Sequence, residues 1–168
     1  KSYFLGDVSI PGLSAFVGGD ITAGILASGM LEQEASTLLI DLGTNGEMAL
    51  GNRHRLHACA TAAGPAFEGG ANRGIWGADM VRLLQKLLEE GLMDGQGLLK
   101  EPYFTKGVRI GDVLVTKESV RAVQLAKGAI AAGIEILVDS YGIRFSDISK
   151  VVLAGGFGYY LDPKAAVA

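Results

Sequence analysis

The hydrophobic pattern of the first third of the chain predicts one helix followed by three strands. Small and apolar residues recur at helical spacing over residues 19–30, with Asp20 in the first turn of the expected helix. Apolar runs at residues 37–41 and 47–51 flank the turn Gly-Thr-Asn-Gly. Such a turn is typical of a β-hairpin because its residues tolerate positive φ angles. A third strand is expected at residues 55–61.

Helical periodicity dominates the rest of the chain. Leucines recur on one side of residues 77–90, and apolar residues recur at three- and four-residue steps over residues 117–141, so both segments predict amphipathic helices. Short apolar runs at residues 112–116 and 150–154 predict two further strands. Residues 94–111, which contain several glycines and a proline, are expected to form a loop.

The order of these elements predicts an α/β fold. Three consecutive strands followed by strand–helix alternation favour a mixed five-stranded sheet, with three antiparallel strands, two parallel strands and helices on both faces. After the last strand, Asp162 and Pro163 are suited to the N-cap and first position of another helix.

Composition narrows the class of protein. The chain has 168 residues, of which 49% are hydrophobic, and a mean hydropathy of +0.31, which is enough for one domain with a substantial core. A net charge of -3 argues against nucleic-acid binding, and no apolar run approaches the roughly 20 residues of a membrane span. The single cysteine, Cys59, can neither form an internal disulfide nor hold an iron–sulfur cluster alone, so a reducing cytoplasm is expected.

Glycine is unusually abundant, with 25 residues against a usual share of about 7%. The glycines gather where strands meet turns and helices rather than in a linker. Glycine at such junctions lets main-chain N–H groups approach a ligand closely, so this distribution suggests a nucleotide or phosphate ligand.

The expected hairpin carries an acid that an ordinary turn does not explain. Asp41 ends a buried strand, where an ionised carboxylate is costly without a partner. It could hold Mg²⁺ or orient an attacking water. Glu47 is a candidate second metal ligand, with a solvent-facing strand residue as the alternative. The candidate phosphate-binding residues of the turn are Gly43, Thr44, Asn45 and Gly46.

A second glycine-rich turn follows the last predicted strand. Ligands of α/β proteins usually bind at the carboxyl ends of strands, where Gly155, Gly156 and Gly158 would let an adenosine press against bare backbone and Phe157 could pack nearby. A tight turn with Phe157 in the core is the alternative for this segment taken alone. Paired with the Asp41 hairpin, it favours a nucleotide site.

These motifs resemble those of a known superfamily. "IDLGTNGE" is similar to a phosphate-binding hairpin of the actin, sugar-kinase and heat-shock-chaperone superfamily, and "VVLAGGFG" is similar to its adenosine motif. Together with "CATAAGPAFEGG" and "VRAVQLAKGAIAAGIEIL", they resemble the C-terminal ATPase domain of the reductive activators of corrinoid-dependent enzymes.

The resemblance implies a ribonuclease H-like, actin-like ATPase lobe. It divides the chain into a first segment with an inter-lobe helix at residues 1–35 and the second lobe at residues 36–168. Since no second Asp-x-Gly hairpin occurs, the chain is expected to be part of a longer protein and inactive alone. The connector at residues 72–74 is shorter than the family pattern predicts.

The resemblance also implies the chemistry. ATP and Mg²⁺ would bind here, and ATP hydrolysis would drive electron transfer to a corrinoid protein from a two-iron two-sulfur cluster outside this chain. The loop with Gly64 and Glu68 would line the nucleotide cleft. Glu68 is a candidate catalytic residue, with a loop-stabilising carboxylate as the alternative. A homodimer is also expected.

Two other functions remain open at this point. One is a small-molecule kinase of the same superfamily, which would need a substrate-recognition lobe. The other is a non-catalytic binding or dimerisation module, because catalysis of phosphoryl transfer needs charged groups on both sides of the phosphates.

Overall fold

A four-stranded mixed sheet forms one part of the computed structural model, which describes residues 12–13, 17–43, 45–64, 77–162 and 164. The strand order is β3-β2-β1-β6, where β6 runs parallel to β1 and the other neighbours are antiparallel. The strands are β1 (Ser36–Leu42), β2 (Gly46–Gly51), β3 (Leu56–Thr61) and β6 (Ile148–Ala154). The predicted hairpin and the parallel return strand are therefore confirmed.

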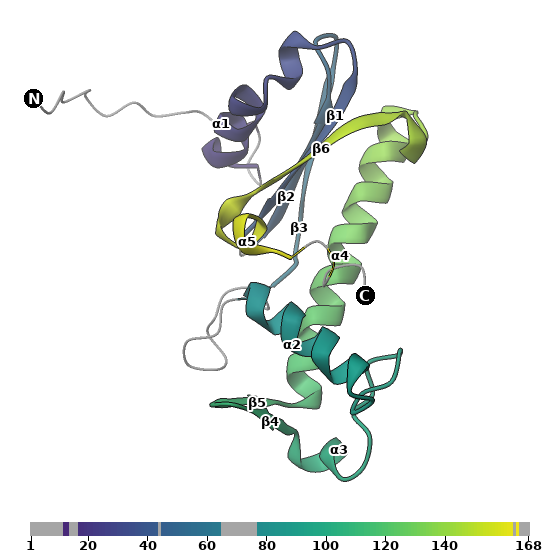
Figure 1. The fold of residues 1–168 in the computed structure, drawn as a ribbon. Helices are drawn as coiled ribbons and strands as arrows, with labels where there is room; N and C mark the ends of the chain where they lie inside the picture. Colours follow the sequence, from purple (N-terminus) through teal and green to yellow (C-terminus); the bar gives the residue numbers. More distant parts are fainter. Residues whose placement is uncertain (1–11, 14–16, 44, 65–76, 163, 165–168) are drawn as a thin grey trace, which may run out of the picture.

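Helices cover both faces of this sheet (Figure 1). On one face, α1 (Gly19–Ser28) packs Ile21 and Ile25 against Leu39 and Ala49. On the other face, the C-terminal half of α4 (Lys117–Tyr141) packs against the alternate residues of the same strands. Because successive strand residues point to opposite faces, the apolar runs of β1 and β2 supply both cores. Two 3₁₀ turns, Met30–Glu32 and Phe145–Asp147, precede β1 and β6.

The expected fifth strand does not belong to this sheet. Among the described residues, β5 (Val113–Val115) pairs only with β4 (Val108–Ile110), in a separate two-stranded hairpin. Residues 94–111 are also more ordered than the predicted loop, because they contain α3 (Tyr103–Lys106) and β4. The reason is local: Gly111, at φ +58°, closes a tight turn that folds β5 back on β4.

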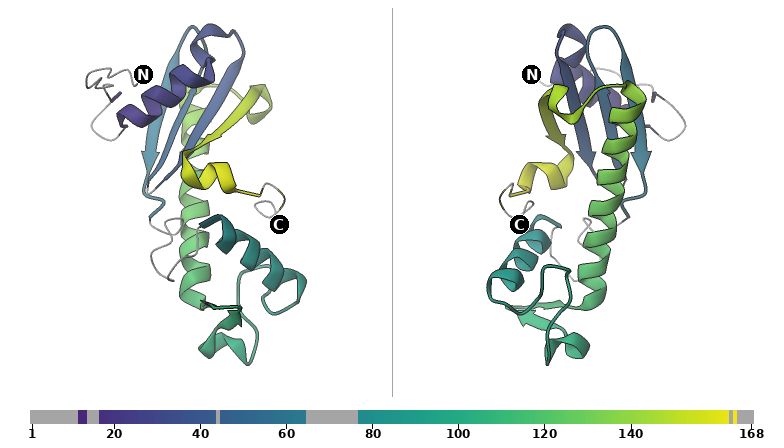
Figure 2. Two further views of the ribbon diagram at one scale, coloured as in Figure 1. Left: turned by 60° about the vertical axis from the view of Figure 1, so that its left-hand side comes forward. Right: turned by 90° about the vertical axis from the view of Figure 1, so that its right-hand side faces the viewer.

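The long helix α4 joins the sheet to a second, smaller part of the molecule (Figures 1 and 2). That part contains α2 (Gly77–Glu89), α3 and the β4–β5 hairpin. Its core packs Leu87, Leu99 and Val115 against Val120 and Ala126 of the N-terminal half of α4. Both predicted helices are confirmed within a residue, and Gly91, at φ +67°, follows α2.

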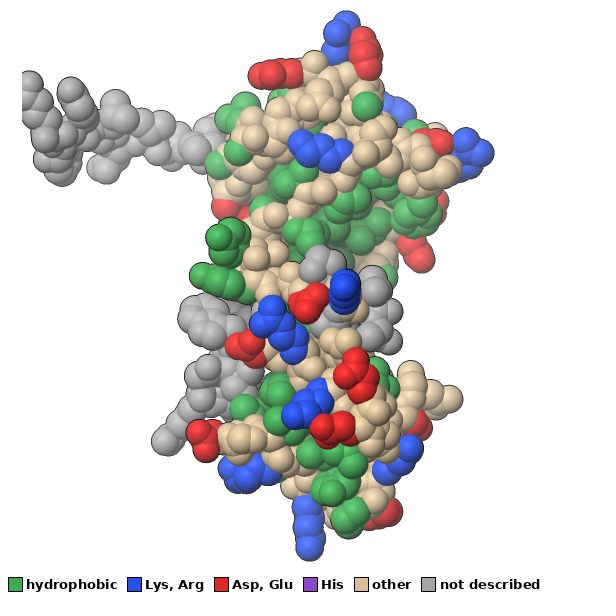
Figure 3. Space-filling view, viewed as in Figure 1, with side chains coloured by type: hydrophobic (Ala, Val, Ile, Leu, Met, Phe, Trp, Pro, Cys, Tyr) green, Lys and Arg blue, Asp and Glu red, His purple; other side chains and the backbone are tan. Residues whose placement is uncertain are grey.

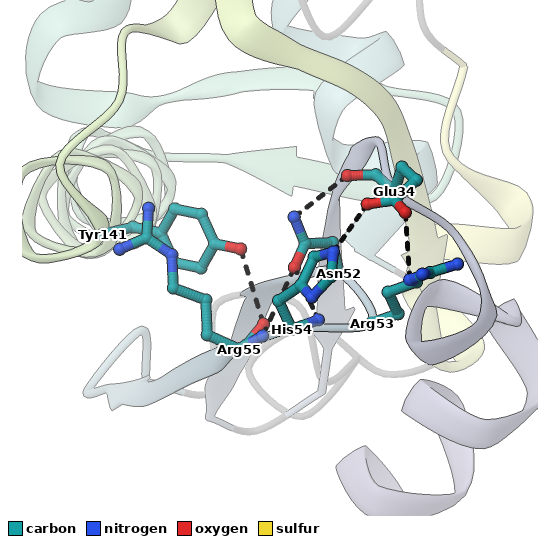
Figure 4. A network of polar contacts seen from close by, with 6 residues as sticks. All are labelled: Glu34, Asn52, Arg53, His54, Arg55 and Tyr141. Atoms are coloured by element: carbon teal, nitrogen blue, oxygen red, sulfur yellow. Dashed lines mark hydrogen bonds and ion pairs between the residues drawn. The ribbon is translucent and has the colours of Figure 1, made fainter.

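Polar contacts fasten the turn between β2 and β3 to the rest of the sheet part (Figure 4). Glu34, just before β1, pairs with Arg53 at 3.1 Å and His54 at 2.6 Å. Arg55 places its guanidinium 3.8 Å above the Tyr141 ring, and the Tyr141 hydroxyl donates to the Arg55 carbonyl at 3.4 Å. The contacts between Arg55 and Tyr141 hold the C-terminal end of α4 over the sheet.

The chain after β6 begins a helix rather than a simple turn. The glycine-rich segment forms α5 (Gly155–Tyr160). Beyond it, Asp162 Oδ1 accepts a hydrogen bond from the Lys164 main-chain N–H at 2.9 Å, as expected of an N-cap. Pro163 lies outside the described residues. No helix in the described part of the chain is long and apolar enough to cross a membrane.

Candidate functional site

The two glycine-rich segments meet at one end of the sheet. Asp41 lies directly opposite Ala154 in the β1–β6 register, and Gly155 follows with φ +80°. A Cβ atom on Gly155 would collide with Asp41 Oδ1 and would lie 2.8 Å from the Leu42 carbonyl oxygen. Only glycine fits here, because both its backbone angle and the close approach of Asp41 exclude a side chain.

The hairpin places a second acid beside Asp41. Asp41 and Glu47 are directly opposed across β1 and β2, so their side chains share one face of the sheet. The turn between them is closed by a hydrogen bond from the Gly43 N–H to the Asn45 carbonyl at 3.3 Å. Asn45 is exposed, and Thr44 lies outside the described residues.

A third acid, Asp20, comes from the first turn of α1. The Gly18 N–H, at the start of this helix, donates to Glu47 Oε1 at 3.4 Å. Sequence reasoning assigned Asp20 only to a helix start and did not place it in the site. A Cβ on Gly18 would lie 2.6 Å from Asp20 Oδ1, so this glycine leaves room for the carboxylate, but nothing in the local sequence indicates that Asp20 faces the hairpin.

The electrostatics of this acidic cluster, Asp20, Asp41 and Glu47, disfavour negative charge. Burial raises the pKa of Asp41, and the charge of Asp20 raises it further. Burial likewise raises the pKa of Glu47, and the charge of Asp20 raises it further. The hydrogen bond from the Gly18 N–H lowers it. Glu47 Oε2 is buried and has no hydrogen-bond partner among the described residues. The cluster would therefore be stabilised by a cation, and its carboxylate oxygens are ligands that Mg²⁺ prefers.

The described residues do not by themselves complete a metal site. No group of three or more His, Cys, Asp or Glu in this part of the chain is arranged to hold a metal ion. A magnesium ion that reached Asp41 and Glu47 would thus need further oxygen ligands, such as waters or phosphates, which Mg²⁺ commonly keeps.

An apolar cavity of about 370 Å³ lies on the opposite side of the sheet end, between the two parts of the molecule. Phe157 of α5 lines it together with Leu84 of α2, Val123 of α4, and Leu42 and Leu153 from the sheet. Asp41 and Gly155 are not among its lining residues. The backbone at the end of β1, near Leu42, and at the start of α5, near Phe157, therefore lies between the acidic cluster and the cavity.

The structure gives less support to a nucleotide-binding role for the remaining predicted residues. Gly64 has φ +74°, and a Cβ built there would meet no atom of the described residues within 4 Å. Gly156 is exposed, and a Cβ on Gly158 would lie 3.4 Å from Leu153 Cβ, which is ordinary van der Waals contact. Glu68 and the connector at residues 72–74 lie outside the described residues.

Comparison with known proteins identifies the family. The chain matches the family described as the C-terminal ASKHA domain of RACo, over residues 35–73 and 70–168. The chain belongs to this family. It is 34% identical to the corrinoid activation enzyme RamQ of Eubacterium limosum, over 91% of this chain and 35% of RamQ. It is 25% identical to the [Co(II) methylated amine-specific corrinoid protein] reductase of Methanosarcina barkeri, over 93% of this chain and 38% of that protein.

A solved structure agrees with the sequence comparison. The fold superposes on a reductive activator for corrinoid,iron-sulfur protein with a TM-score of 0.82 at 30% identity, covering 94% of this chain and 33% of that one. The chain thus spans about a third of the length of these relatives.

The comparison also locates the unusual connector. The alignment with RamQ extends over 210 positions, more than the 168 residues of this chain, so RamQ carries residues that this chain lacks. The family match comes in two segments that overlap at residues 70–73, next to the connector at residues 72–74.

Proposed function

We propose that this chain is the second, nucleotide-binding lobe of an ATP-dependent reductive activator of a corrinoid protein. In the longer protein, binding and hydrolysis of ATP between two lobes would drive electron transfer from an iron–sulfur domain to the corrinoid cobalt. The cluster must lie outside these residues, because Cys59 alone cannot hold one. We also propose that the protein works in a reducing cytoplasm as a homodimer. Residues 1–35 would form the entry and inter-lobe segment, and residues 36–168 would form the lobe.

The contact between Asp41 and Gly155 carries this proposal. It brings the predicted phosphate hairpin and the predicted adenosine segment together at the carboxyl ends of two parallel strands, where ligands of α/β folds bind. Family membership and the relatives' names support the same activity.

The proposed roles follow from position. Main-chain N–H groups of residues 43–46 would bind phosphate oxygens, and Asp41 with Glu47 would hold Mg²⁺ through its waters. Asp20 would add a third negative charge to that ion's surroundings. Gly155, beside Asp41, would let the adenosine approach the main chain closely next to this hairpin.

Hydrolysis of Mg-ATP by the longer protein tests this assignment. Asp41→Ala should lower the turnover number by two orders of magnitude or more, because a single charge-positioning group in phosphoryl transfer contributes on that scale. Glu32→Ala removes an exposed acid outside the acidic cluster and is the matched control. Unchanged hydrolysis in Asp41→Ala would refute the role of Asp41.

Titration of the isolated 168-residue chain with Mg-ATP should show weak binding, and the chain should show little turnover. Only one of the two sets of phosphate-binding groups is present in this chain. Micromolar binding measured by calorimetry would contradict this expectation and show that one lobe is sufficient.

A further inference from the structure

Two helix sides face each other across the apolar cavity between the two parts of the molecule. On α2, the cavity is lined by Val81, Leu84 and Leu88, at steps of three and four residues. On α4, the lining residues lie at the same kind of spacing: Val120, Val123, Lys127 and Ile130. Residues at such steps share one side of a helix, so each helix directs a continuous side toward the cavity.

The cavity lies where the two cores meet. Leu42 of β1 and Leu153 of β6 line it from the sheet, and Phe157 of α5 lines it beside them. Phe157 packs both against the core between the sheet and α4 and against the core of the smaller part. A molecule bound in the cavity would therefore contact both parts at once.

The loop that forms another wall of the cavity is fixed by its own hydrogen bonds. Asp94 Oδ1 accepts from the main-chain N–H groups of Gln96 and Leu98 at 2.9 and 2.8 Å. Gln124 of α4 donates through Nε2 to the Gln96 carbonyl at 2.7 Å. Because Asp94 and Gln124 are themselves lining residues, this wall is in place before any ligand binds.

The chemistry of the lining favours an uncharged ligand. Apolar side chains predominate, and the charged residues among the described lining are one acid and one base, Asp94 and Lys127. Asp94 is engaged by the loop, and Lys127 is exposed. A charged ligand would lose its hydration against apolar walls, whereas an apolar ligand gains from leaving water.

The size of the cavity sets the size of the ligand. An apolar protein cavity of about 150 Å³ can hold one benzene molecule. The cavity described here has about 370 Å³, within the range of small-molecule pockets, and so has room for two linked aromatic rings.

We propose that this cavity is a binding site for an uncharged, largely apolar small molecule of about two aromatic rings. Its lining does not include Asp41 or Gly155, so the site is separate from the proposed nucleotide site and is tested separately. Because the ligand contacts Leu84 of α2 and Leu153 of β6 together, it favours the arrangement of the two parts in this structure and stabilises the folded chain by mass action.

Titration of the 168-residue chain with N-phenyl-1-naphthylamine tests the site. This uncharged two-ring-system dye becomes more fluorescent in apolar surroundings. We expect saturable binding of one molecule per chain, with a dissociation constant in the micromolar range. The melting temperature should rise with dye concentration, as it does for any ligand that binds only the folded state.

Substitutions that fill the cavity locate the dye. Leu84→Trp and Val81→Phe, one helical turn apart on α2, should each weaken dye binding at least tenfold, because the larger ring occupies the space of the ligand. Their melting temperatures without dye should not fall, since filling a cavity commonly stabilises a protein. Leu125→Trp is the matched control, because Leu125 is 56% exposed on α4 and is not a lining residue.

Adenosine distinguishes the cavity from the nucleotide site. Added in excess, it should leave the dye bound, since the proposed nucleotide site lies on the other side of the sheet end. The proposal is overturned by any of three results. These are fluorescence that does not saturate, equal dye binding by the wild type and by both cavity-filling variants in their folded state, and displacement of the dye by adenosine in a one-to-one exchange.

Discussion

The main-chain N–H of Gly18, at the start of α1, donates to the Glu47 carboxylate on β2 across 29 positions of sequence. This bond ties the helix that precedes the sheet to the hairpin that would hold phosphate. Because Asp20 follows in the same turn of α1, the bond also brings a third negative charge toward Asp41 and Glu47. The acidic cluster is thus assembled from three segments, and its repulsion should be measurable in the absence of divalent cations.

The first prediction concerns pH. The ordinary pKa values of Asp41 and Glu47, 3.8 and 4.5, are both raised by folding. The folded chain therefore binds protons at these groups more tightly than the unfolded chain does. Their contribution to the free energy of unfolding is fully present below about pH 4 and is lost as pH rises through the raised values. Asp41→Asn, melted without Mg²⁺, should raise the melting temperature at pH 7.5 and flatten its dependence between pH 4 and 7.

The exposed acid Glu89, on α2, provides the control for that experiment. Glu89→Gln removes the same charge far from the acidic cluster and should change neither the melting temperature nor its pH dependence appreciably. If the melting temperatures of the wild type and of Asp41→Asn change in parallel across this pH range, the carboxylates of the acidic cluster do not repel one another.

The second prediction concerns the meeting point of the two glycine-rich segments. Gly155→Ala should destabilise the chain by about 1–3 kcal/mol, because it strains the backbone and displaces Asp41. In the longer protein it should also weaken Mg-ATP binding. Gly156→Ala is a matched control one residue away, since no atom of the described part of the chain lies within 4 Å of its Cβ position. Equal denaturation midpoints for the two variants would mean that the close approach is not required.

The third prediction compares two glycines of α4. Gly133→Ala should cost about 1–3 kcal/mol, because the new methyl group would press on Met48 and Thr61. Gly128→Ala should instead stabilise the chain by up to about 1 kcal/mol, since alanine favours the helix and its Cβ would lie within 4 Å of no described atom. Urea denaturation of the two variants measures both changes, and two changes of the same sign would contradict the packing described.

Sequence pattern was most informative where structure is decided locally. The hairpin between β1 and β2 was predicted because its turn residues and flanking apolar runs are adjacent, and α4 because its periodicity extends over 25 residues. The prediction of a fifth strand in the main sheet was wrong because an apolar triplet such as Val113–Val115 can pair with the free edge of any strand. Nothing in its own residues indicates that the edge is β4 rather than the main sheet.

The site shows the same division between local and distant information. Asp41 and the glycines that follow it could be found from their own motif, and the resemblance joined them to Gly155. Asp20 could not be found in this way, because it reaches the hairpin only through the packing of Ile21 and Ile25 on the sheet. Contacts of that kind depend on tertiary structure, which no local pattern of residues reports.

Hydrophobic side chains also remain exposed on β6, the edge of the sheet (Figure 3). Val151 and Leu153 are 56% and 42% exposed. They lie on the same face of the sheet as α4, at the edge that the helix does not cover. They mark where further parts of a longer protein could pack without disturbing the acidic cluster on the other face.

The continuity of α4 has a mechanical consequence. A helix of 25 residues is about 37 Å long, and its two halves are embedded in different cores. The helix contains no proline to bend it, so a rotation of the sheet by about 10° would swing the distant β4–β5 end through roughly 6 Å. A small rearrangement beside Asp41 would in this way be converted into a large displacement at the opposite extremity of the molecule.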